Sequence, residues 1–260
     1  MTYETFAIDV VRQAADLILR MREEGFDVST KGGDARDLVT SIDLAVNEYV
    51  LSRIKESYPE HGIYSEESQG EHSAGSYQWT VDPIDGSANF SRGIPHFAIC
   101  LGLLQDGVPV AAAILNPVTN ELFSFTKGQG ARLGGKPIRV STVQELSKAQ
   151  GLLSFGSRKK DLWDWAASSY RKSLEHMLKR VMLNSSSLDI CFLAAGRADV
   201  CVYGTLSTLD IAPALGLLYE AGGVACDAQG NDVSYTKESQ KVYLANNPTL
   251  LVQVRELFER

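Results

Sequence analysis

Apolar positions recur every three or four residues over two segments near the N-terminus, 3–24 and 42–57. Apolar residues with a period near 3.6 share one face of a helix, so both segments are predicted to be amphipathic helices. Gly25 is expected to end the first helix. Ser41 is the predicted N-cap of the second helix, which would place Asp43 in its first turn.

From Tyr77 to about Val140 the pattern changes to short apolar runs separated by turn residues. The separating residues are Gln-Asp-Gly, Asn-Pro and Lys-Gly, which are typical of the connections in antiparallel hairpins. We therefore predict an antiparallel meander with a further hairpin tip at Gly134-Gly135. Its strands are predicted at 97–104, 108–115 and 121–126.

The second half of the chain alternates between strand-like and helix-like segments. Strands are predicted at 152–154 and 200–203, and helices at 162–179, 187–195, 211–221 and 248–258. Near the N-terminus, segment 31–36 is polar and glycine-rich, which predicts a loop. Together these elements predict one mixed, layered α/β domain over residues 1–260, with subregions of about 1–140 and 141–260.

Composition and charge narrow the functional classes. The 260 residues are 44% hydrophobic and carry a net charge of −7, so we expect neither a nucleic-acid partner nor a membrane surface. The N-terminus lacks the features of a signal peptide, and no apolar run reaches the ~18 residues of a membrane span. The four cysteines lie in apolar contexts without a CxxC pair, which predicts core residues of a reduced, cytoplasmic protein. They are Cys100, Cys191, Cys201 and Cys226.

The segment most informative for function is Asp82-Pro83-Ile84-Asp85-Gly86-Ser87, which follows an apolar run ending at Val81. Its two aspartates lie three residues apart around a proline, so both carboxylates can reach one hard cation. Backbone N–H groups after Gly86 would then face an anion held by that cation. The same residues also fit a plain turn, with Pro fixing φ and Gly taking a positive φ. The hexapeptide alone leaves both interpretations open.

Further acidic residues stand where a predicted strand ends or a predicted helix begins. They are Asp43, Glu66, Glu67 and Asp210. Side chains at such positions converge on one cleft in layered α/β folds. Each also has a structural explanation: Asp210 as a helix N-cap, Asp43 as a carboxylate that balances a helix dipole, and the glutamate pair as a solvated loop. For each acidic residue taken alone, the structural explanation is favoured. Taken together, the order and spacing of these residues match a known family.

The sequence resembles the inositol monophosphatase family of metal-dependent phosphomonoesterases, over nearly the whole chain. The matching segments are 37–43, 65–68, 82–87, 209–212 and 220–223, with Asn89-Phe90, Gly93-Ile94-Pro95 and Asn246-Asn247 beside them. The resemblance implies an α/β fold of the mixed layered αβαβα sugar-phosphatase type. It also implies a Mg²⁺-dependent, Li⁺-sensitive phosphatase that forms a homodimer and acts on a small phosphate ester.

The resemblance further implies a role for each matching residue. Glu66, Asp82 and the carbonyl of Ile84 would hold one Mg²⁺, while Asp82, Asp85 and Asp210 would hold a second. A third, weaker ion is expected near Glu66, and oxygen ligands alone suit Mg²⁺. The remaining implied roles are orientation of a water by Glu66 and Ser87, proton relay by Thr40 and Asp43, and phosphate binding by the backbone of Gly86 and Ser87. Lys31 is either a further contact to phosphate or metal, or a solvated loop lysine.

The expected substrate pocket departs from the family pattern. Animal members have a glutamate that binds sugar hydroxyls where this chain has Tyr203, and the pocket segment that includes Ser185 and Ser186 is also altered. Losing a carboxylate that pairs with hydroxyls should weaken discrimination for inositol. We therefore expect broad or non-inositol preference, for inositol phosphates or sugar phosphates such as fructose 1,6-bisphosphate. The alternatives are histidinol phosphate, 3′-phosphoadenosine 5′-phosphate, or a non-catalytic relative that binds sugar phosphates or a partner protein.

Overall fold

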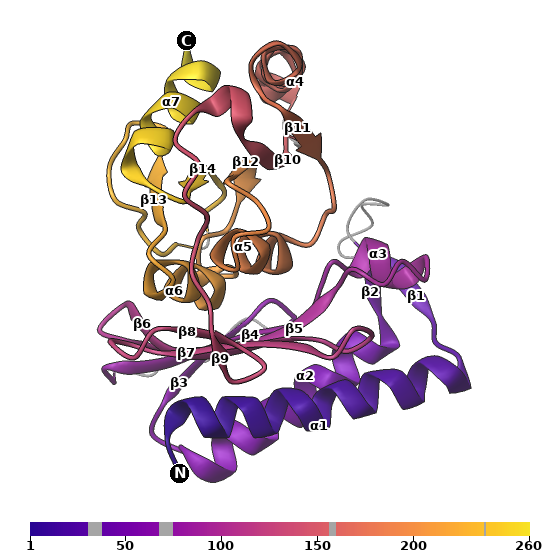
Figure 1. Cartoon of the computed structure of the whole chain (residues 1–260). Helices are drawn as coiled ribbons and strands as arrows, with labels where there is room; N and C mark the ends of the chain where they lie inside the picture. The colour runs from indigo at the N-terminus through magenta and orange to yellow at the C-terminus, as the bar shows by residue number, and fades with distance from the viewer. Residues whose placement is uncertain (31–37, 68–74, 156–159, 237) are drawn as a thin grey trace.

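The computed structural model describes residues 1–30, 38–67, 75–155, 160–236 and 238–260. Its elements form alternating layers of helices, sheet, helices, sheet and helices (Figure 1). The mixed αβαβα architecture predicted from the sequence is therefore confirmed. Within the described ranges, no helix is both long and apolar enough to span a bilayer.

The larger sheet has seven strands among the described residues, in the order β3-β4-β5-β6-β7-β8-β9. β3 runs parallel to β4, and every other neighbouring pair is antiparallel. The predicted meander is confirmed, and the hairpin tip has positive φ at Gly134 and Gly135, as glycine permits. The strands are β3 (Gly62–Ser65), β4 (Tyr77–Asp85), β5 (Ala98–Gln105), β6 (Val108–Asn116), β7 (Glu121–Thr126), β8 (Ala131–Leu133) and β9 (Lys136–Pro137).

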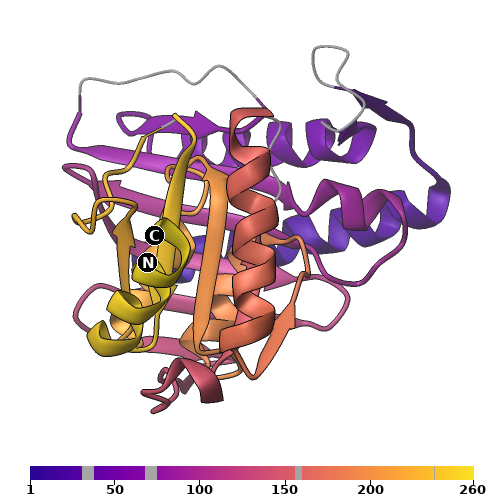
Figure 2. The same ribbon diagram turned by 90° about the horizontal axis from the view of Figure 1, so that it is seen from above.

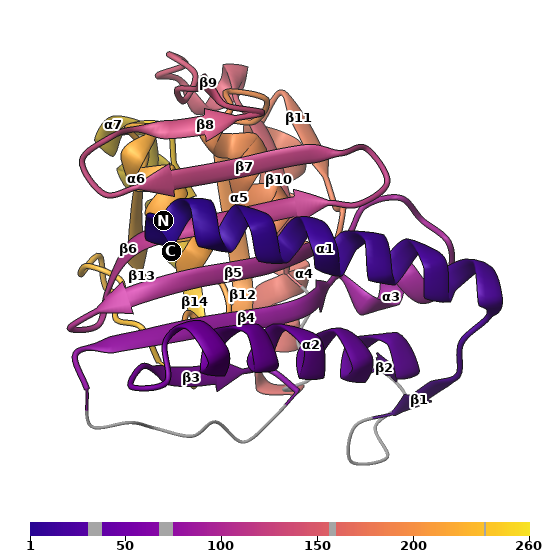
Figure 3. The same cartoon turned by 90° about the horizontal axis from the view of Figure 1, so that it is seen from below.

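Two long helices cover the outer face of the larger sheet (Figure 3). They are α1 (Tyr3–Glu24) and α2 (Ser41–Ser57), both predicted from their periodicity. Their apolar faces pack with buried residues of the sheet such as Trp79 and Leu101 in one hydrophobic cluster. The N-cap of α2 is Thr40, so the prediction of Ser41 is wrong by one residue.

The smaller sheet has the order β11-β10-β12-β14-β13 within the described part of the chain. β10 is parallel to both β11 and β12, whereas β14 is antiparallel to both β12 and β13. Its strands are β10 (Gln150–Ser154), β11 (Lys179–Val181), β12 (Val200–Leu206), β13 (Val224–Asp227) and β14 (Gln240–Ala245). Helices α4 (Trp163–His176) and α7 (Pro248–Glu259) form the outermost layer above it (Figure 2).

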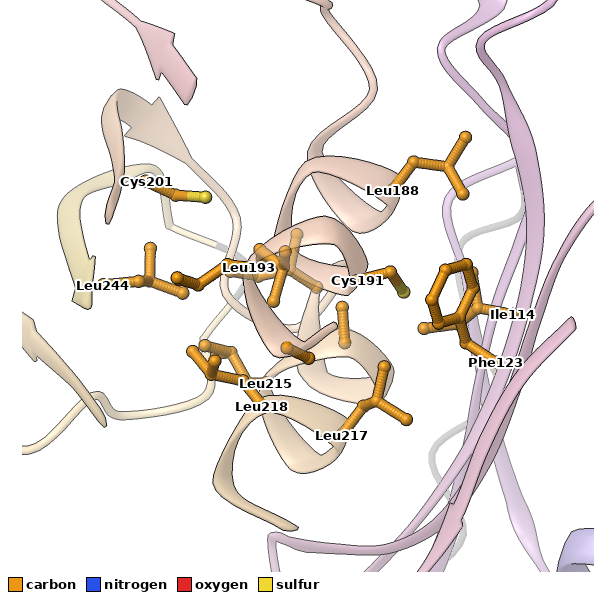
Figure 4. Packing of buried hydrophobic residues seen from close by; sticks show 14 of the residues in the cluster. Ile114, Phe123, Leu188, Cys191, Leu193, Cys201, Leu215, Leu217, Leu218 and Leu244 are labelled. Atoms are coloured by element: carbon orange, nitrogen blue, oxygen red, sulfur yellow. The ribbon is translucent and has the colours of Figure 1, made fainter. Parts of the chain in front are cut away.

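The middle layer consists of α5 (Ser186–Ala194) and α6 (Ala212–Glu220), which lie between the two sheets. Both helices are apolar on nearly all sides because they contact a sheet above and a sheet below. Figure 4 shows their leucines packed with Cys191, Cys201, Ile114 and Phe123. The four cysteines are buried and unpaired, as predicted.

In the second half and near the N-terminus, one predicted helix is too long and several strands were missed. The helix predicted at 162–179 ends at His176, because Met177 takes an extended conformation and the chain enters β11. Strands β13 and β14 were not predicted. A two-stranded antiparallel sheet, β1 (Val28–Thr30) with β2 (Leu38–Thr40), was also missed.

Candidate active site

A bulge at the end of β4 places Asp82 and Asp85 on the same side of the larger sheet. Residues three apart in a regular strand face opposite sides. Here Asp82 is opposite Cys100 and Asp85 is opposite Ala98, so β4 contains one extra residue over this interval. Cys100 and Ala98 both belong to the core between the sheets. Both carboxylates therefore point toward the second half of the molecule.

Gly86 follows β4 in a left-handed conformation that strongly favours glycine. Its φ is +94°, and a Cβ at this position would lie 3.2 Å from both the carbonyl oxygen of His96 and the Cβ of Ser185. The close approach joins the two halves of the molecule at the site. The short helix α3 (Ser87–Ser91) follows, and the side-chain amide of Asn89 donates to the carbonyl oxygens of His96 at 2.8 Å and Leu183 at 2.7 Å.

The first turn of α5 binds the carboxylate of Asp85. The Ser185 hydroxyl and the Ser187 backbone N–H donate to its Oδ2, the latter at 2.9 Å, and the Ser186 hydroxyl donates to Oδ1 at 3.0 Å. Burial raises the pKa of Asp85, and these hydrogen bonds oppose that shift by favouring the charged form. The sequence placed Ser185 and Ser186 in a substrate pocket; both hydroxyls donate to Asp85 in this structure.

Thr40 and Asp43 form a capping box at the start of α2. The backbone N–H of Thr40 donates to Asp43 Oδ2 at 2.8 Å, the Thr40 hydroxyl donates to the same oxygen, and Asp43 N–H donates back to that hydroxyl. The Ser87 hydroxyl lies 3.4 Å from Asp43 Oδ1 and 3.0 Å from the carbonyl oxygen of Ile84. Asp43 therefore lies in the first turn of α2, as predicted, and its second oxygen faces Ser87.

Asp210 lies at the turn between β12 and α6. It is not a helix cap, since α6 has Ile211 at its N-cap and no side-chain capping bond. The phenol of Tyr64 donates to Asp210 Oδ1 at 2.8 Å. Tyr64 was not among the predicted site residues. The available signal was its place on β3 two residues before Glu66, because alternate residues of a strand share a side.

The carboxylates of this site raise one another's pKa. Burial is the largest cause of the raised pKa of Asp82, followed by repulsion from Glu66, Asp85, Asp210 and Asp43. Burial, and then repulsion from Glu66, raise the pKa of Asp210 to about 6. The predicted ligands thus share one electrostatic environment, although they come from β4, the end of β3 and the turn before α6.

The predicted ligand atoms are chemically suited to a hard divalent cation, but their present arrangement is not that of a formed metal site. All predicted ligand atoms are oxygens, and the crowding of buried negative charge would be relieved by a cation. Among the residues that the structure describes, however, no three His, Cys, Asp or Glu side chains already form a metal-ligand group. In this structure, protein donors bind both oxygens of Asp85 and Oδ1 of Asp210.

Three further residues were predicted for the site: Tyr203, Glu66 and Lys31. Tyr203 is buried, and its hydroxyl donates to the backbone carbonyl of Ser186 at 3.2 Å. Glu66 is exposed beside β4, where its backbone N–H donates to the Val81 carbonyl at 3.2 Å. Lys31 falls outside the described residues.

Comparisons with known proteins agree with this architecture. The model of the inositol monophosphatase family matches residues 2–259. The Nus factor SuhB of Escherichia coli strain K12 is 33% identical over 227 residues, which cover 86% of this chain and 84% of that protein. The solved Thermotoga maritima IMPase superposes with a TM-score of 0.88 and 26% identity, over 98% of this chain and 95% of the other. An inositol monophosphatase–fructose 1,6-bisphosphatase shares the fold, with a TM-score of 0.84, 23% identity and coverage of 99% and 100%.

Proposed function

The chain belongs to the inositol monophosphatase family, and we propose that it is a Mg²⁺-dependent phosphatase of small phosphate monoesters. The main support is the carboxylate cluster around the buried Asp82, whose pKa is raised first by burial and then by repulsion from Glu66, Asp85, Asp210 and Asp43. Such a cluster opposes folding unless a cation or protons neutralise it. Perturbed carboxylates gathered from distant segments are typical of catalytic sites.

The proposed ligands follow the family pattern, with two or three ions in all. Glu66, Asp82 and the Ile84 carbonyl would hold one Mg²⁺, and Asp82, Asp85 and Asp210 a second. Bound Mg²⁺ would supply charge neutralisation at the phosphoryl oxygens and a water of lowered pKa.

The protein's own groups would orient the reactants and move the proton. Glu66 and the Ser87 hydroxyl would orient the attacking water. The proton would pass from Ser87 Oγ toward Asp43 Oδ1, which lies 3.4 Å away, while Thr40 holds the other oxygen of Asp43. The backbone N–H groups of Gly86 and Ser87 would bind phosphate.

The proposed substrate range is broad. Tyr203 provides no carboxylate to pair with sugar hydroxyls. Its side chain is buried, and its hydroxyl donates to the Ser186 carbonyl. We therefore expect hydrolysis of inositol phosphates and of sugar phosphates such as fructose 1,6-bisphosphate, with histidinol phosphate and 3′-phosphoadenosine 5′-phosphate as rivals. Ser185 and Ser186 border the proposed pocket while their hydroxyls hold Asp85, and Lys31, outside the described residues, is proposed as a further contact to phosphate or metal. Li⁺ sensitivity, a homodimer and a cytoplasmic location belong to the same proposal.

A phosphate-release assay on this substrate panel, with and without Mg²⁺, tests the proposal. We expect hydrolysis of several esters that requires Mg²⁺ and is inhibited by Li⁺. Strong preference for inositol 1-phosphate would refute the broad range, and absence of hydrolysis with any ester and metal would refute the enzyme. Sedimentation of the purified chain would test the homodimer.

A second candidate is a partner-binding role like that of the relatives named Nus factors, which are at least 31% identical to this chain in several bacteria. One observation favours it: Trp163, Tyr170 and Leu174 are about half exposed at helical spacing on α4. Such a role does not require catalysis. A variant without turnover that still performs the cellular function would favour this candidate.

A further inference from the structure

Tyr64 connects the two halves of the molecule at the proposed metal site. It is the third residue of β3 in the larger sheet, and its phenol donates at 2.8 Å to Oδ1 of Asp210, which is 146 positions away. Tyr64 itself is 8% exposed. The hydroxyl of a buried tyrosine needs a partner, and here the partner is a proposed ligand.

The ring and the hydroxyl of Tyr64 make different contacts. The ring belongs to a small apolar cluster with Leu104, Leu209 and Ala212, so it packs against residues on both sides of Asp210. The hydroxyl donates to the Asp210 carboxylate and also has a hydrogen bond with the side chain of Ser207. Removing the hydroxyl therefore leaves the apolar packing of the turn in place.

The backbone of this turn is also fixed from another direction. The Thr208 hydroxyl donates to the Ser234 carbonyl at 2.6 Å and accepts from Thr236 N–H at 2.9 Å. Leu209 N–H donates to the Thr236 carbonyl at 3.2 Å. These bonds hold the main chain just before Asp210 independently of Tyr64. The Tyr64 hydroxyl is then left to set the orientation of the Asp210 side chain, together with Ser207.

The same strand also positions a second proposed ligand. Tyr64 pairs with Thr80 and Ser65 pairs with Val81 in the parallel register of β3 and β4. Glu66 continues that register through its bond to the Val81 carbonyl. Glu66 therefore comes beside Asp82, and Tyr64, two residues earlier, faces the same side.

We propose that Tyr64 is a positioning residue for the divalent cation: its hydroxyl holds Oδ1 of Asp210 and directs the other carboxylate oxygen toward a cation shared with Asp82 and Asp85. The inference rests on the proposed function. Outer hydrogen bonds to metal-ligating carboxylates typically contribute about 10–100-fold in metal affinity.

Direct metal titration of Tyr64→Phe tests the inference without substrate. Mn²⁺ binding is followed by electron paramagnetic resonance and Mg²⁺ binding by calorimetry, with the metal-free thermal midpoint measured in parallel. We expect the affinity of one cation site to fall about tenfold or more. In the phosphatase assay, the Mg²⁺ concentration for half-maximal rate should rise while kcat at saturating Mg²⁺ stays near the wild-type value.

Tyr243→Phe is the matched control, because the Tyr243 hydroxyl donates to Glu259 in the outer layer of the smaller sheet. It removes a comparable tyrosine–carboxylate bond far from the site and should leave metal affinity unchanged. If Tyr64→Phe binds the metals as tightly as wild type, or more tightly, the inference is wrong while the proposed function stands. If the wild-type protein binds no divalent cation, both fail.

Discussion

The layer between the two sheets contains two buried regions of opposite character. Its centre is apolar, with leucines of α5 and α6 packed against both sheets (Figure 4). At the start of α5, a few residues from that centre, Ser185–Ser187 enclose the carboxylate of Asp85. Burial stabilises the fold in the centre, because apolar surface leaves water. Burial opposes folding at the carboxylate cluster, where charged groups lose hydration and repel one another.

Asp82→Asn is expected to have the largest effect and to separate the two regions most clearly. Turnover should fall roughly a thousandfold or more, because a residue proposed to share both cations is lost. The metal-free protein should become more stable, since the buried charge is removed while the amide oxygen still accepts the Ile84 N–H that Asp82 Oδ1 accepts at 3.0 Å. Thermal midpoints with and without Mg²⁺, beside kcat, measure both effects.

Asp16→Asn, on the exposed face of α1, is the control for this variant and should change neither quantity. The wild-type midpoint should rise with Mg²⁺ and the Asp82→Asn midpoint should rise less, since only a cation that binds the native state stabilises it. A lower metal-free midpoint for Asp82→Asn, with turnover retained, would mean that Asp82 is a structural residue.

Leu215→Ala probes the apolar centre and should give the reverse result. Leu215 is fully buried in the core between the sheets, so its truncation should cost about 2–5 kcal/mol of unfolding free energy. The rate per folded molecule should stay near that of wild type. Urea unfolding and active-site titration measure the two quantities, and a large loss of rate in fully folded protein would show that the core and the site are not separable.

Asp189 lies on α5 between the two regions, and its titration gives a smaller, pH-dependent effect. Burial raises the pKa of Asp189 to about 6. The neighbouring His96, whose Nε2 lies 3.1 Å from Asp189 Oδ1, favours the charged form of Asp189, whereas repulsion from Asp85 disfavours it. Its unfolded pKa is about 3.9. The stability from protonated Asp189 is therefore fully present below about pH 3.9 and is lost as pH rises through about 6.

Asp189→Asn should remove that contribution. The unfolding free energy of wild type minus that of the variant should decrease by up to about 3 kcal/mol between pH 4 and 7, measured by urea unfolding of metal-free protein. Asp164→Asn, at an exposed position of α4, is the control. A difference that grows with pH would reverse the assigned direction of the pKa shift.

Local signals were sufficient to predict the parts of the fold with strong periodicity. The helices α1 and α7 have long amphipathic patterns, and the meander has a turn signal between every pair of strands. The short strands β1, β2 and β11 have three residues each, too few for an alternating pattern. β11 in particular is defined by its pairing with β10, which no local pattern shows.

The carboxylates of the site were predictable because they form ordered motifs, whereas their hydrogen-bond partners were not. Tyr64 is an ordinary strand residue in sequence, and its role depends on Asp210, 146 positions away. Ser185 and Ser186 were identified as polar pocket residues, but their orientation toward Asp85 depends on how α5 meets the bulge of β4. Contacts between segments that are distant in sequence thus account for most of what was missed.

Two substitutions of Ser87 test the finest detail at the carboxylate cluster, where a single hydroxyl lies between Asp43 and the Ile84 carbonyl. Ser87→Ala should lower kcat about a hundredfold, the usual contribution of one proton-transfer group. Ser87→Thr keeps the hydroxyl and should leave kcat nearly unchanged, the smallest effect expected. If Ser87→Ala retains full activity, the hydroxyl only closes the first turn of α3, and the water must be oriented by Glu66 alone.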